Sequence, residues 1–356
     1  MRIVQVGVYP PPFGGVSVHL QRLHDHLRRQ GRDSLLLDLS GIPKASTGVR
    51  SVSWPVARSW LRRAERSIVH FHNFAPHLAA TFHRAARRHV VVLSLHDERF
   101  ADEIRRSGTV RSRLARFHVR RLACVVVNNR SSESRARRLL GRRAEIRLIP
   151  EFIPPLALPA LADPGLLELR RRHRFLVASA AASIPFRAGA ELYGLDLLVG
   201  AVGRLVRERG LDVALALLLP TVGDEGDLAG LRERCRALAI ADRVRLVTEP
   251  LPEAGSLWRE ADVTVRATTS DGNSLAVLEA LSLGVPVVAS DCVERPEGAE
   301  LFRTRDGADL ARRLESVLTD LPRFRARVRA VSHPGSARAF LELYDGLAGR
   351  SVAHAA

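Results

Sequence analysis

Short apolar runs alternate along this chain with longer amphipathic stretches. The runs are rich in Val, Leu and Ile and are bounded by Gly, Pro or polar residues, as in buried parallel strands. They fall at Arg2–Val8, Leu35–Leu39, Ser67–Phe71, Val90–Leu95, Ala123–Asn128, Ile146–Pro150, Arg174–Ser179, Val213–Leu219, Val244–Val247 and Ala261–Arg266. Helical patterns cover Ser17–Gln30, Ala79–Arg88, Leu195–Arg209, Leu310–Leu318 and Ser336–Leu347. This alternation predicts an α/β protein with parallel sheets.

The chain is too long for one compact core, because its 356 residues favour two domains. The segment Phe152–Asp163 is rich in proline and alanine and is typical of a linker. We therefore predict a first domain over residues 1–155, a linker over 156–172, a second domain over 173–332 and a C-terminal helix over 333–356. Beyond the α/β alternation, no internal repeat is visible.

The three cysteines, Cys124, Cys235 and Cys292, are dispersed and form no CxxC pair. The opening MRIVQVGVYPPP reads as a strand and a loop rather than a signal peptide, and no apolar run approaches the ~18–20 residues that span a bilayer. These features lead us to expect a cytoplasmic protein with reduced thiols.

The formal net charge is +17, and Lys44 is the only lysine. Arginines cluster in RSRLARFHVRRL, from Arg111, and in RARRLLGRRAEIR, from Arg135. Each cluster is either a solvated helix face or a site of peripheral contact with an anionic membrane. In the second case, the protein would lie at the inner face of that membrane. Nucleic acid is disfavoured as a partner, because these stretches lack interleaved aromatic residues and any nucleic-acid motif.

The most informative stretch is SDGNSLAVLEALSLGVPVVASD, from Ser270. It predicts a loop, a helix capped by Asn273 or Ser274, and a buried strand. Within the apolar helix, Glu279 is a carboxylate that is either paired internally or kept for a ligand. The N–H groups at the helix start favour phosphate, and a carboxylate further along can accept both hydroxyls of a ribose. Together they indicate a sugar nucleotide.

The phrase DGNSLAVLEALSLGVPVVASDCVERPEG resembles the acid-x7-Glu motif of the retaining GT-B glycosyltransferases of family 4, the glycosyltransferase group 1 family. The resemblance implies two Rossmann-like domains with parallel sheets facing a central cleft, and a C-terminal helix that crosses back to the first domain. It also implies that Glu279 holds the donor ribose and that Asp271 lies near the donor sugar and its diphosphate. The donor-binding set then includes Gly272, Asn273, Ser274 and Leu275. Two departures are Asp271, where the family usually has Glu, and Ala267, where it has Pro.

Other site residues follow from the same resemblance. The loop YPPPFGG looks like the family's first loop, so Gly14 and Gly15 would let the backbone approach the donor diphosphate; the alternative is a tight turn that needs a positive φ. His96 ends an apolar strand, as the family's strand-end histidine does, and would reach the transferred sugar; the alternative is a structural histidine. Weaker acceptor-side candidates are His70, His72 and Asn73.

Arg187 is the available cation after the second domain's first strand, where the family often has Arg and Lys. Tyr193 stands where that Lys is common. Arg187 would bind the diphosphate, or else lie on a surface loop. Arg295-Pro296 reads as a structural turn, with a place at the mouth of the cleft as the alternative.

The resemblance implies a retaining, metal-independent glycosyltransferase that moves a hexose-type sugar from a UDP- or GDP-sugar to an acceptor hydroxyl. Its catalytic residues would be His96, Asp271 and Arg187, with no metal and no cofactor besides the nucleotide sugar. The expected acceptor is a saccharide or a lipid-linked molecule in polysaccharide, glycolipid or glycoconjugate biosynthesis. The alternatives are a non-catalytic nucleotide-sugar-binding partner and a nucleotide-sugar epimerase of the same fold. A dehydrogenase is disfavoured, because no GxGxxG follows any strand.

Overall fold

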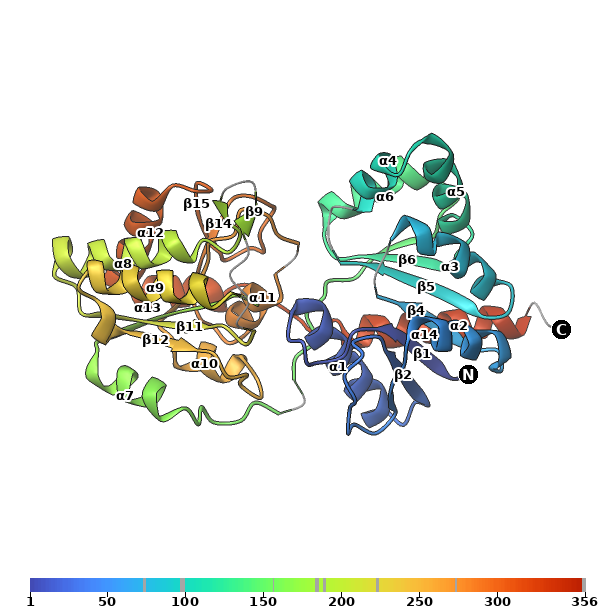
Figure 1. Ribbon diagram of the computed structural model, residues 1–356, viewed down its shortest axis with the longest axis horizontal. Helices are drawn as coiled ribbons and strands as arrows, with labels where there is room; N and C mark the ends of the chain where they lie inside the picture. Colours follow the sequence, from blue (N-terminus) through green and yellow to red (C-terminus); the bar gives the residue numbers. More distant parts are fainter. Residues whose placement is uncertain are drawn as a thin grey trace. The chain divides into compact units, whose positions relative to one another are not determined.

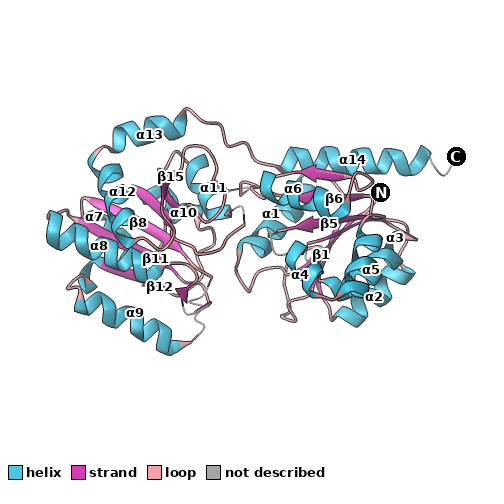
Figure 2. Ribbon diagram, turned by 90° about the horizontal axis from the view of Figure 1, so that it is seen from above, coloured by secondary structure: helices cyan, strands magenta, loops and turns pink. Residues whose placement is uncertain are grey.

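The computed structural model describes residues 1–72, 75–96, 100–155, 157–182, 186–187, 190–221, 224–272 and 274–353. The chain divides into two compact units. Unit 1 comprises Met1–Leu156 and Gly335–Ala356, and unit 2 comprises Ala157–Pro334. Each unit has a parallel sheet with helices on both faces, as Figures 1 and 2 show.

Unit 1 contains a seven-stranded sheet in the order β3-β2-β1-β4-β5-β6-β7, and every strand pair is parallel. Its strands are β1 (Ile3–Gly7), β2 (Ser34–Asp38), β3 (Val49–Ser51), β4 (Ile68–Phe71), β5 (Val90–Leu95), β6 (Cys124–Val127) and β7 (Ile146–Leu148). The apolar runs of the first domain therefore form strands, and their carboxyl ends meet at one edge of the sheet.

The helices of unit 1 cover both faces of this sheet. They are α1 (Gly15–Arg29), α2 (Trp54–Arg63), the short 3-10 helix η1 (Pro76–Leu78), α3 (Ala79–Ala86), α4 (Phe100–Arg106), α5 (Thr109–Val119), α6 (Arg130–Leu140) and α14 (Ala337–Ala353). Successive strand residues point to opposite faces: Val91 packs with the residues of α2 to α6, and Val92 packs with those of α1 and α14. No helix in the described part of the chain is long and apolar enough to cross a membrane.

The C-terminal helix belongs to unit 1, as predicted. Phe340 and Tyr344 of α14 are buried against Ile3 and Leu23. The chain enters this helix through Gly335, where a β-carbon would lie 2.4 Å from the Pro154 side chain. The backbone N–H of Ser336 then donates to the carbonyl of Phe152 at 2.7 Å. Residues at the two ends of the sequence thus share one core.

Unit 2 contains a six-stranded parallel sheet in the order β12-β11-β8-β13-β14-β15 and a separate antiparallel pair, β9 and β10. The strands are β8 (Phe175–Ala180), β9 (Phe186–Arg187), β10 (Ala190–Glu191), β11 (Val213–Leu218), β12 (Val244–Val247), β13 (Val263–Arg266), β14 (Val287–Ser290) and β15 (Glu300–Phe302). The helices are α7 (Pro164–Arg172), α8 (Leu195–Arg209), α9 (Glu225–Ala237), the 3-10 helix η2 (Ala241–Arg243), α10 (Gly255–Glu260), α11 (Leu275–Ser282), α12 (Gly307–Thr319) and α13 (Leu321–Arg329).

Part of the stretch predicted as a linker, 156–172, forms helix α7. The Asp163 carboxylate accepts a hydrogen bond from the backbone N–H of Leu166 at 2.8 Å and so caps the helix. Pro164 occupies the first helical position, where its missing N–H costs nothing. Leu166 and Leu169 are buried in the core of unit 2. Proline at this position starts a helix, whereas the composition alone indicated a linker.

Candidate functional site

The sheet of unit 2 reverses its strand order between β8 and β13. The chain adds β11 and β12 on one side of β8 and then returns to place β13 on the other side. In open parallel sheets, ligands bind beyond the carboxyl ends of the strands at such a reversal. Arg266 is the last residue of β13, and its Nη1 donates to the carbonyl of Ala180, the last residue of β8, at 3.2 Å. A guanidinium therefore lies at the reversal point.

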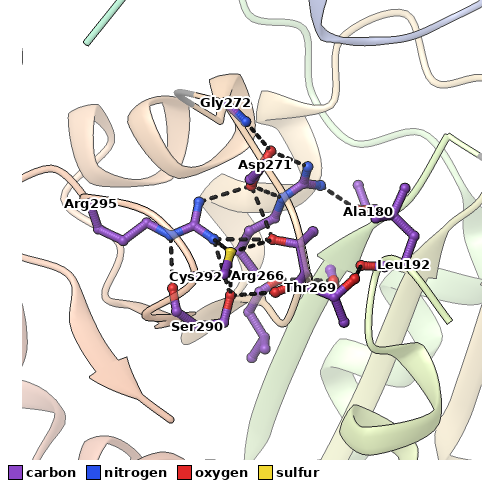
Figure 3. A network of polar contacts seen from close by, with 12 residues as sticks. Ala180, Leu192, Arg266, Thr269, Asp271, Gly272, Ser290, Cys292 and Arg295 are labelled. Carbon is purple, nitrogen blue, oxygen red and sulfur yellow. Dashed lines mark hydrogen bonds and ion pairs between the residues drawn. The ribbon is translucent and has the colours of Figure 1, made fainter. Parts of the chain in front are cut away.

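Asp271 binds two arginines, as Figure 3 shows. Its Oδ2 and Oδ1 accept from Nε and Nη2 of Arg266 at 2.9 and 3.0 Å, a bidentate pair. Its Oδ2 also accepts from Nη1 of Arg295 at 2.8 Å. The backbone N–H of Gly272 donates to Oδ1 at 3.1 Å. Both carboxylate oxygens of Asp271 are thus committed to partners within unit 2.

Arg295 is buried, with a side-chain exposure of 1%. Its Nε donates to the carbonyl of Ser290, at the end of β14, at 3.0 Å, and its Nη2 donates to the hydroxyl of Thr268 at 3.1 Å. Sequence reasoning treated Arg295 as part of a turn or of the cleft mouth. Its role in binding Asp271 was missed, because the two residues are 24 positions apart and meet only through the order of β13 and β14.

The cluster of Asp271, Arg266 and Arg295 carries a net charge of +1. Burial alone would raise the pKa of the Asp271 carboxyl, but Arg266 and Arg295 outweigh burial and hold this pKa well below its usual range. The carboxylate is therefore ionised at neutral pH, and the guanidiniums outnumber it. Arg266 remains the more accessible of the two arginines, with a side-chain exposure of 15%. The cluster can attract an anion and is unsuited to protonating one.

Tyr193 packs on the same cluster. The Arg266 guanidinium lies 5.0 Å from the centre of the Tyr193 ring, a cation–π contact. Gly194 follows with a φ of +67°, and a β-carbon there would lie 2.2 Å from the carbonyl oxygen of Ala267. Glycine is required here, because a side chain has neither the conformation nor the space. Tyr193 stands where the family commonly has Lys, so at this position an aromatic ring packs against the guanidinium of Arg266.

The start of helix α8 is already bound to a carboxylate. Glu191 is buried and accepts hydrogen bonds from the backbone N–H groups of Tyr193, at 2.7 Å, and of Leu195. Burial raises the pKa of the Glu191 carboxyl, although these two hydrogen bonds oppose the shift. The N–H groups at this helix start are therefore engaged within the protein.

Glu279 lies on α11 and is buried, with an exposure of 5%. The indole Nε1 of Trp258, a fully buried residue of α10, donates to Glu279 Oε2 at 2.9 Å. The prediction of a buried Glu279 is confirmed, and Trp258 is an internal partner that the sequence did not reveal.

Helix α11 begins close to Asp271. Ser274 is its N-cap residue, its side chain makes no capping hydrogen bond, and the first turn, from Leu275, contains no acidic residue. Gly284 follows the end of the helix; it has a φ of +74°, and its N–H donates to the carbonyl of Leu281. Asn273, the other predicted cap, lies outside the described residues. The structure thus presents an N-terminus without a carboxylate cap, unlike that of α8.

Arg187 lies in the two-residue strand β9, paired with Ala190 of β10. Its side chain lies outside the described part of the structure, so its predicted role in diphosphate binding stays a prediction. Of the cations in the described residues near the reversal point, Arg266 and Arg295 are those that the geometry identifies.

In unit 1, the two glycines of the first loop stand at the start of α1. Gly14 is the N-cap residue with an extended φ of −171°, and Gly15 is the first helical residue. The alternative of a tight turn with positive φ at these residues is therefore wrong. A β-carbon at either glycine would meet no atom within 4 Å. Neither backbone conformation nor internal packing requires glycine here.

His96 follows β5 and is held by residues from two other strand ends. Its Nδ1 lies 3.0 Å from Oε1 of Glu151, which follows β7, and its Nε2 lies 3.3 Å from Nδ1 of His72, which follows β4. Asn128, after β6, donates to the carbonyl of His96 at 3.0 Å and to Glu151. Sequence reasoning did not single out Glu151 or Asn128, although both end apolar strands.

Three further histidines are buried around His96. His19 of α1 places its Nδ1 2.7 Å from the carbonyl of Glu151, and His70 bonds the hydroxyl of Tyr344 at 2.7 Å. Burial lowers the pKa of His19 to about 3 and holds the pKa of His70 and His72 well below the usual value. The structure thus makes His70 part of the core. Asn73, the third acceptor-side candidate, lies outside the described residues.

The described residues contain no group of three or more His, Cys, Asp or Glu side chains that could hold a metal ion.

Two family models match the chain. The family model described as "Glycosyl transferases group 1" matches residues 187–320, and the one described as "Glycosyl transferase 4-like domain" matches residues 9–151. No curated protein matches the chain.

Solved structures with this fold include sucrose-phosphate synthase from Thermosynechococcus elongatus, at a TM-score of 0.72 and 17% identity, with 100% of both chains covered. Anabaena Alr3699/HepE in complex with UDP-glucose aligns at a TM-score of 0.69 and 16% identity, covering 99% of this chain and 100% of that one. Trehalose-6-phosphate synthase OtsA aligns at 0.69 and 14%, covering 97% and 98%. The two units therefore have the GT-B fold.

Proposed function

The chain belongs to the group 1 glycosyltransferases, and we propose that it is a retaining enzyme that moves a sugar from a nucleotide diphosphate sugar to an acceptor hydroxyl. The observation that carries this proposal is that the chain after β13 brings two features to unit 2. One is the buried carboxylate of Glu279 on α11, and the other is the positively charged cluster of Arg266, Arg295 and Asp271. A nucleotide sugar has ribose hydroxyls that can donate to Glu279, and it has phosphates that the positively charged cluster can attract.

Each part of the donor then has a proposed partner. Glu279, whose Oε2 accepts from the indole of Trp258, also accepts hydrogen bonds from the ribose hydroxyls. The diphosphate lies at the N-terminus of α11, from Gly272 to Leu275, where the helix dipole and Arg266 favour negative charge. Arg187 supplies a second cation in this proposal.

Asp271 has a positioning role in this scheme. Its bidentate bond orients the guanidinium of Arg266, and its bond to Arg295 anchors the cluster to β14. This differs from direct contact with the donor sugar, because both oxygens of Asp271 already accept from arginine or backbone donors.

The chemistry requires no protein nucleophile. As the bond between the sugar and the diphosphate breaks, negative charge develops on the diphosphate, and fixed dipoles and cations stabilise it. The leaving phosphate takes the proton of the acceptor hydroxyl, which attacks from the same face, so the anomeric configuration is retained. His96 contributes by orienting the transferred sugar. Because Nε2 of His96 already contacts His72, a sugar hydroxyl at that atom would have to replace this contact.

We propose UDP as the first donor nucleotide to test and GDP as the second. The fold is shared with a protein solved with UDP-glucose, Anabaena Alr3699/HepE, and with sucrose-phosphate synthase. For the acceptor, we propose a saccharide or a lipid-linked hydroxyl. Transfer proceeds without a divalent metal, so chelation by EDTA leaves turnover unchanged; lost turnover that a divalent ion restores would contradict this.

The test of the donor site compares UDP with 2′-deoxy-UDP, and GDP with 2′-deoxy-GDP, by calorimetric titration. Hydrogen bonds to a charged group contribute roughly 1.5–3 kcal/mol, so wild type should bind the ribonucleotide at least about tenfold more tightly. Glu279→Gln keeps an acceptor for Trp258 but loses the charge, and it should lose most of this preference. Glu260→Gln, in the neighbouring helix α10, is the matched control and should keep it.

Three results would contradict the proposed donor site. If wild type binds neither UDP nor GDP, the proposed donor site is excluded. If it binds ribo- and deoxynucleotides equally, the proposed contact with the ribose hydroxyl is excluded. A preference that survives in Glu279→Gln would assign the ribose to another residue. Tight binding without transfer to any acceptor would favour a non-catalytic partner, and conversion of the donor alone would favour an epimerase.

A further inference from the structure

Helix α5 of unit 1 carries a row of exposed apolar side chains on its outward face. The helix packs on α3, α4 and α6 through the buried side chains of Ser112, Ala115 and Val119, and it lies at the periphery of the unit in Figure 1. Val110, Leu114 and Phe117 are 70%, 51% and 47% exposed. Their spacing of four and three residues places them in one row on the helix.

This row is unusual within the molecule. The described residues include ten large exposed hydrophobic side chains, and no described helix or strand other than α5 carries more than one of them. Single exposed hydrophobic residues are normal on protein surfaces, whereas a contiguous row marks an interaction surface. The outward face of α5 is therefore a candidate contact surface.

Arginines flank the apolar row. The exposed residues beside it are Arg111, Arg113, Arg120 and Arg121, and the Arg121 guanidinium lies 3.7 Å from the centre of the Phe117 ring. No acidic residue occurs between Glu103 and Glu133 in the sequence. Of the acids on α4 and α6, Asp102 is bound by Arg105 and Glu133 by Arg137. Among the described residues, no ion pair joins an acidic side chain to the exposed arginines of α5.

The combination of apolar side chains and arginines on this face favours one of three kinds of partner. A second copy of the same face would bring arginines against arginines, which is unfavourable. Nucleic acid would contact the arginines but leave the aliphatic side chains without apolar contacts. An anionic bilayer satisfies both features, because phosphate headgroups pair with arginine while the acyl-chain boundary accepts apolar side chains.

We propose that the outward face of α5 binds the surface of an anionic lipid bilayer, with Val110, Leu114 and Phe117 inserted between the headgroups. The arginines beside the row bind lipid phosphates. This inference concerns unit 1 alone and does not depend on the sugar-transfer reaction or on the donor site.

The test is co-sedimentation of the full chain with vesicles of phosphatidylcholine alone and of phosphatidylcholine with phosphatidylglycerol, at several salt concentrations. Wild type should bind only the anionic vesicles, and more weakly as salt rises. Replacing Arg111, Arg113 and Arg121 by Gln should reduce the affinity on the order of a hundredfold, because each charge near the surface contributes several-fold. Leu114→Asp with Phe117→Asp should abolish binding.

Matched controls separate this face from the overall charge of +17. On helix α2 of the same unit, Arg58, Arg62 and Arg63 are exposed, and their triple Gln variant removes the same charge. Val56→Asp on α2 alters a side chain that is 52% exposed. Both controls should bind like wild type, and circular dichroism should show that all variants are folded.

The proposal is overturned if wild type does not bind anionic vesicles. It is also overturned if the α2 variants lose as much affinity as the α5 variants, which would indicate general electrostatic attraction. Binding that survives Leu114→Asp with Phe117→Asp would exclude insertion of the apolar row. Self-association that these substitutions abolish, without vesicle binding by wild type, would identify a second copy as the occupant.

Discussion

Replacing Asp271 by Asn should strongly destabilise unit 2. The substitution keeps the size of the side chain but removes the charge that faces Arg266 and Arg295. Arg295 is 1% exposed and Asp271 9%, so water does not replace the lost interaction. Removing one partner of a buried ion pair costs roughly 3–5 kcal/mol. Because Arg295 keeps the carbonyl of Ser290 as an acceptor, we expect the low end, about 3 kcal/mol of unfolding free energy.

The chain offers a specific probe for this measurement. Its three tryptophans are Trp54 and Trp60 in unit 1 and Trp258 in unit 2, so a Trp54→Phe, Trp60→Phe background reports on unit 2 alone. Urea unfolding followed by Trp258 fluorescence should show a midpoint lowered by about 1 to 1.5 M. The depressed pKa of Asp271 gives stability that is present above the unfolded value of about 3.9. The cost should therefore be equal at pH 7 and pH 5 and shrink only below about pH 4.

The control is Asp196→Asn, which breaks the bidentate pair with Arg305 on the surface of the same unit. That pair is a third exposed and should contribute less than about 1 kcal/mol. If Asp271→Asn costs no more than Asp196→Asn, the reasoning from burial is refuted. The double variant with Arg295→Met should be more stable than the sum of its single changes predicts, by about 1–3 kcal/mol.

Two further predictions concern the two cores. Gly194→Ala should destabilise unit 2 by more than about 2 kcal/mol, because Gly194 has a φ of +67° and a β-carbon would collide with the Ala267 carbonyl. The Trp258 fluorescence assay measures this loss of stability. A nearly unchanged unfolding free energy would contradict the backbone geometry. Unit 1 should lose stability as the pH falls below about 6.5, because burial depresses the pKa of His19, His70 and His72 and the unfolded chain then binds more protons. The loss should reach about 1.4 kcal/mol per histidine per pH unit, measured by the unit 1 tryptophans at pH 7, 6 and 5, and a pH-independent unit 1 would contradict it.

Local patterns were sufficient for most of the architecture. Apart from β3 and β15, which were not predicted, the strands of both sheets lie within a few residues of predicted strands. Helix α8 occupies Leu195–Arg209 as predicted. The burial of Glu279 also followed from its helix, because an apolar sequence on nearly all sides leaves a side chain no exposed face. Helix α7 was not predicted, because the proline content of 152–163 indicated a linker, whereas Asp163 and Pro164 cap and start a helix.

The contacts that make the candidate site depended on the order of strands. Arg266 contacts the Ala180 carbonyl only because β13 lies beside β8 in the sheet. Along the sequence, three elements separate β8 from β11, and several more precede β13. In unit 1, Glu151 reaches His96 because β7 and β5 end at the same edge of one parallel sheet.

The sequence by itself determined the α/β alternation, the family and the buried carboxylate of α11, because each of these depends on residues that are neighbours along the chain. Only the tertiary structure decided the partners: Asp271 with Arg295, and His70 with Tyr344, which is 274 residues away. Side-chain periodicity specifies which face of an element is buried, and it carries no information on which distant side chain meets that face. Strand order and the return of α14 to unit 1 supply that information.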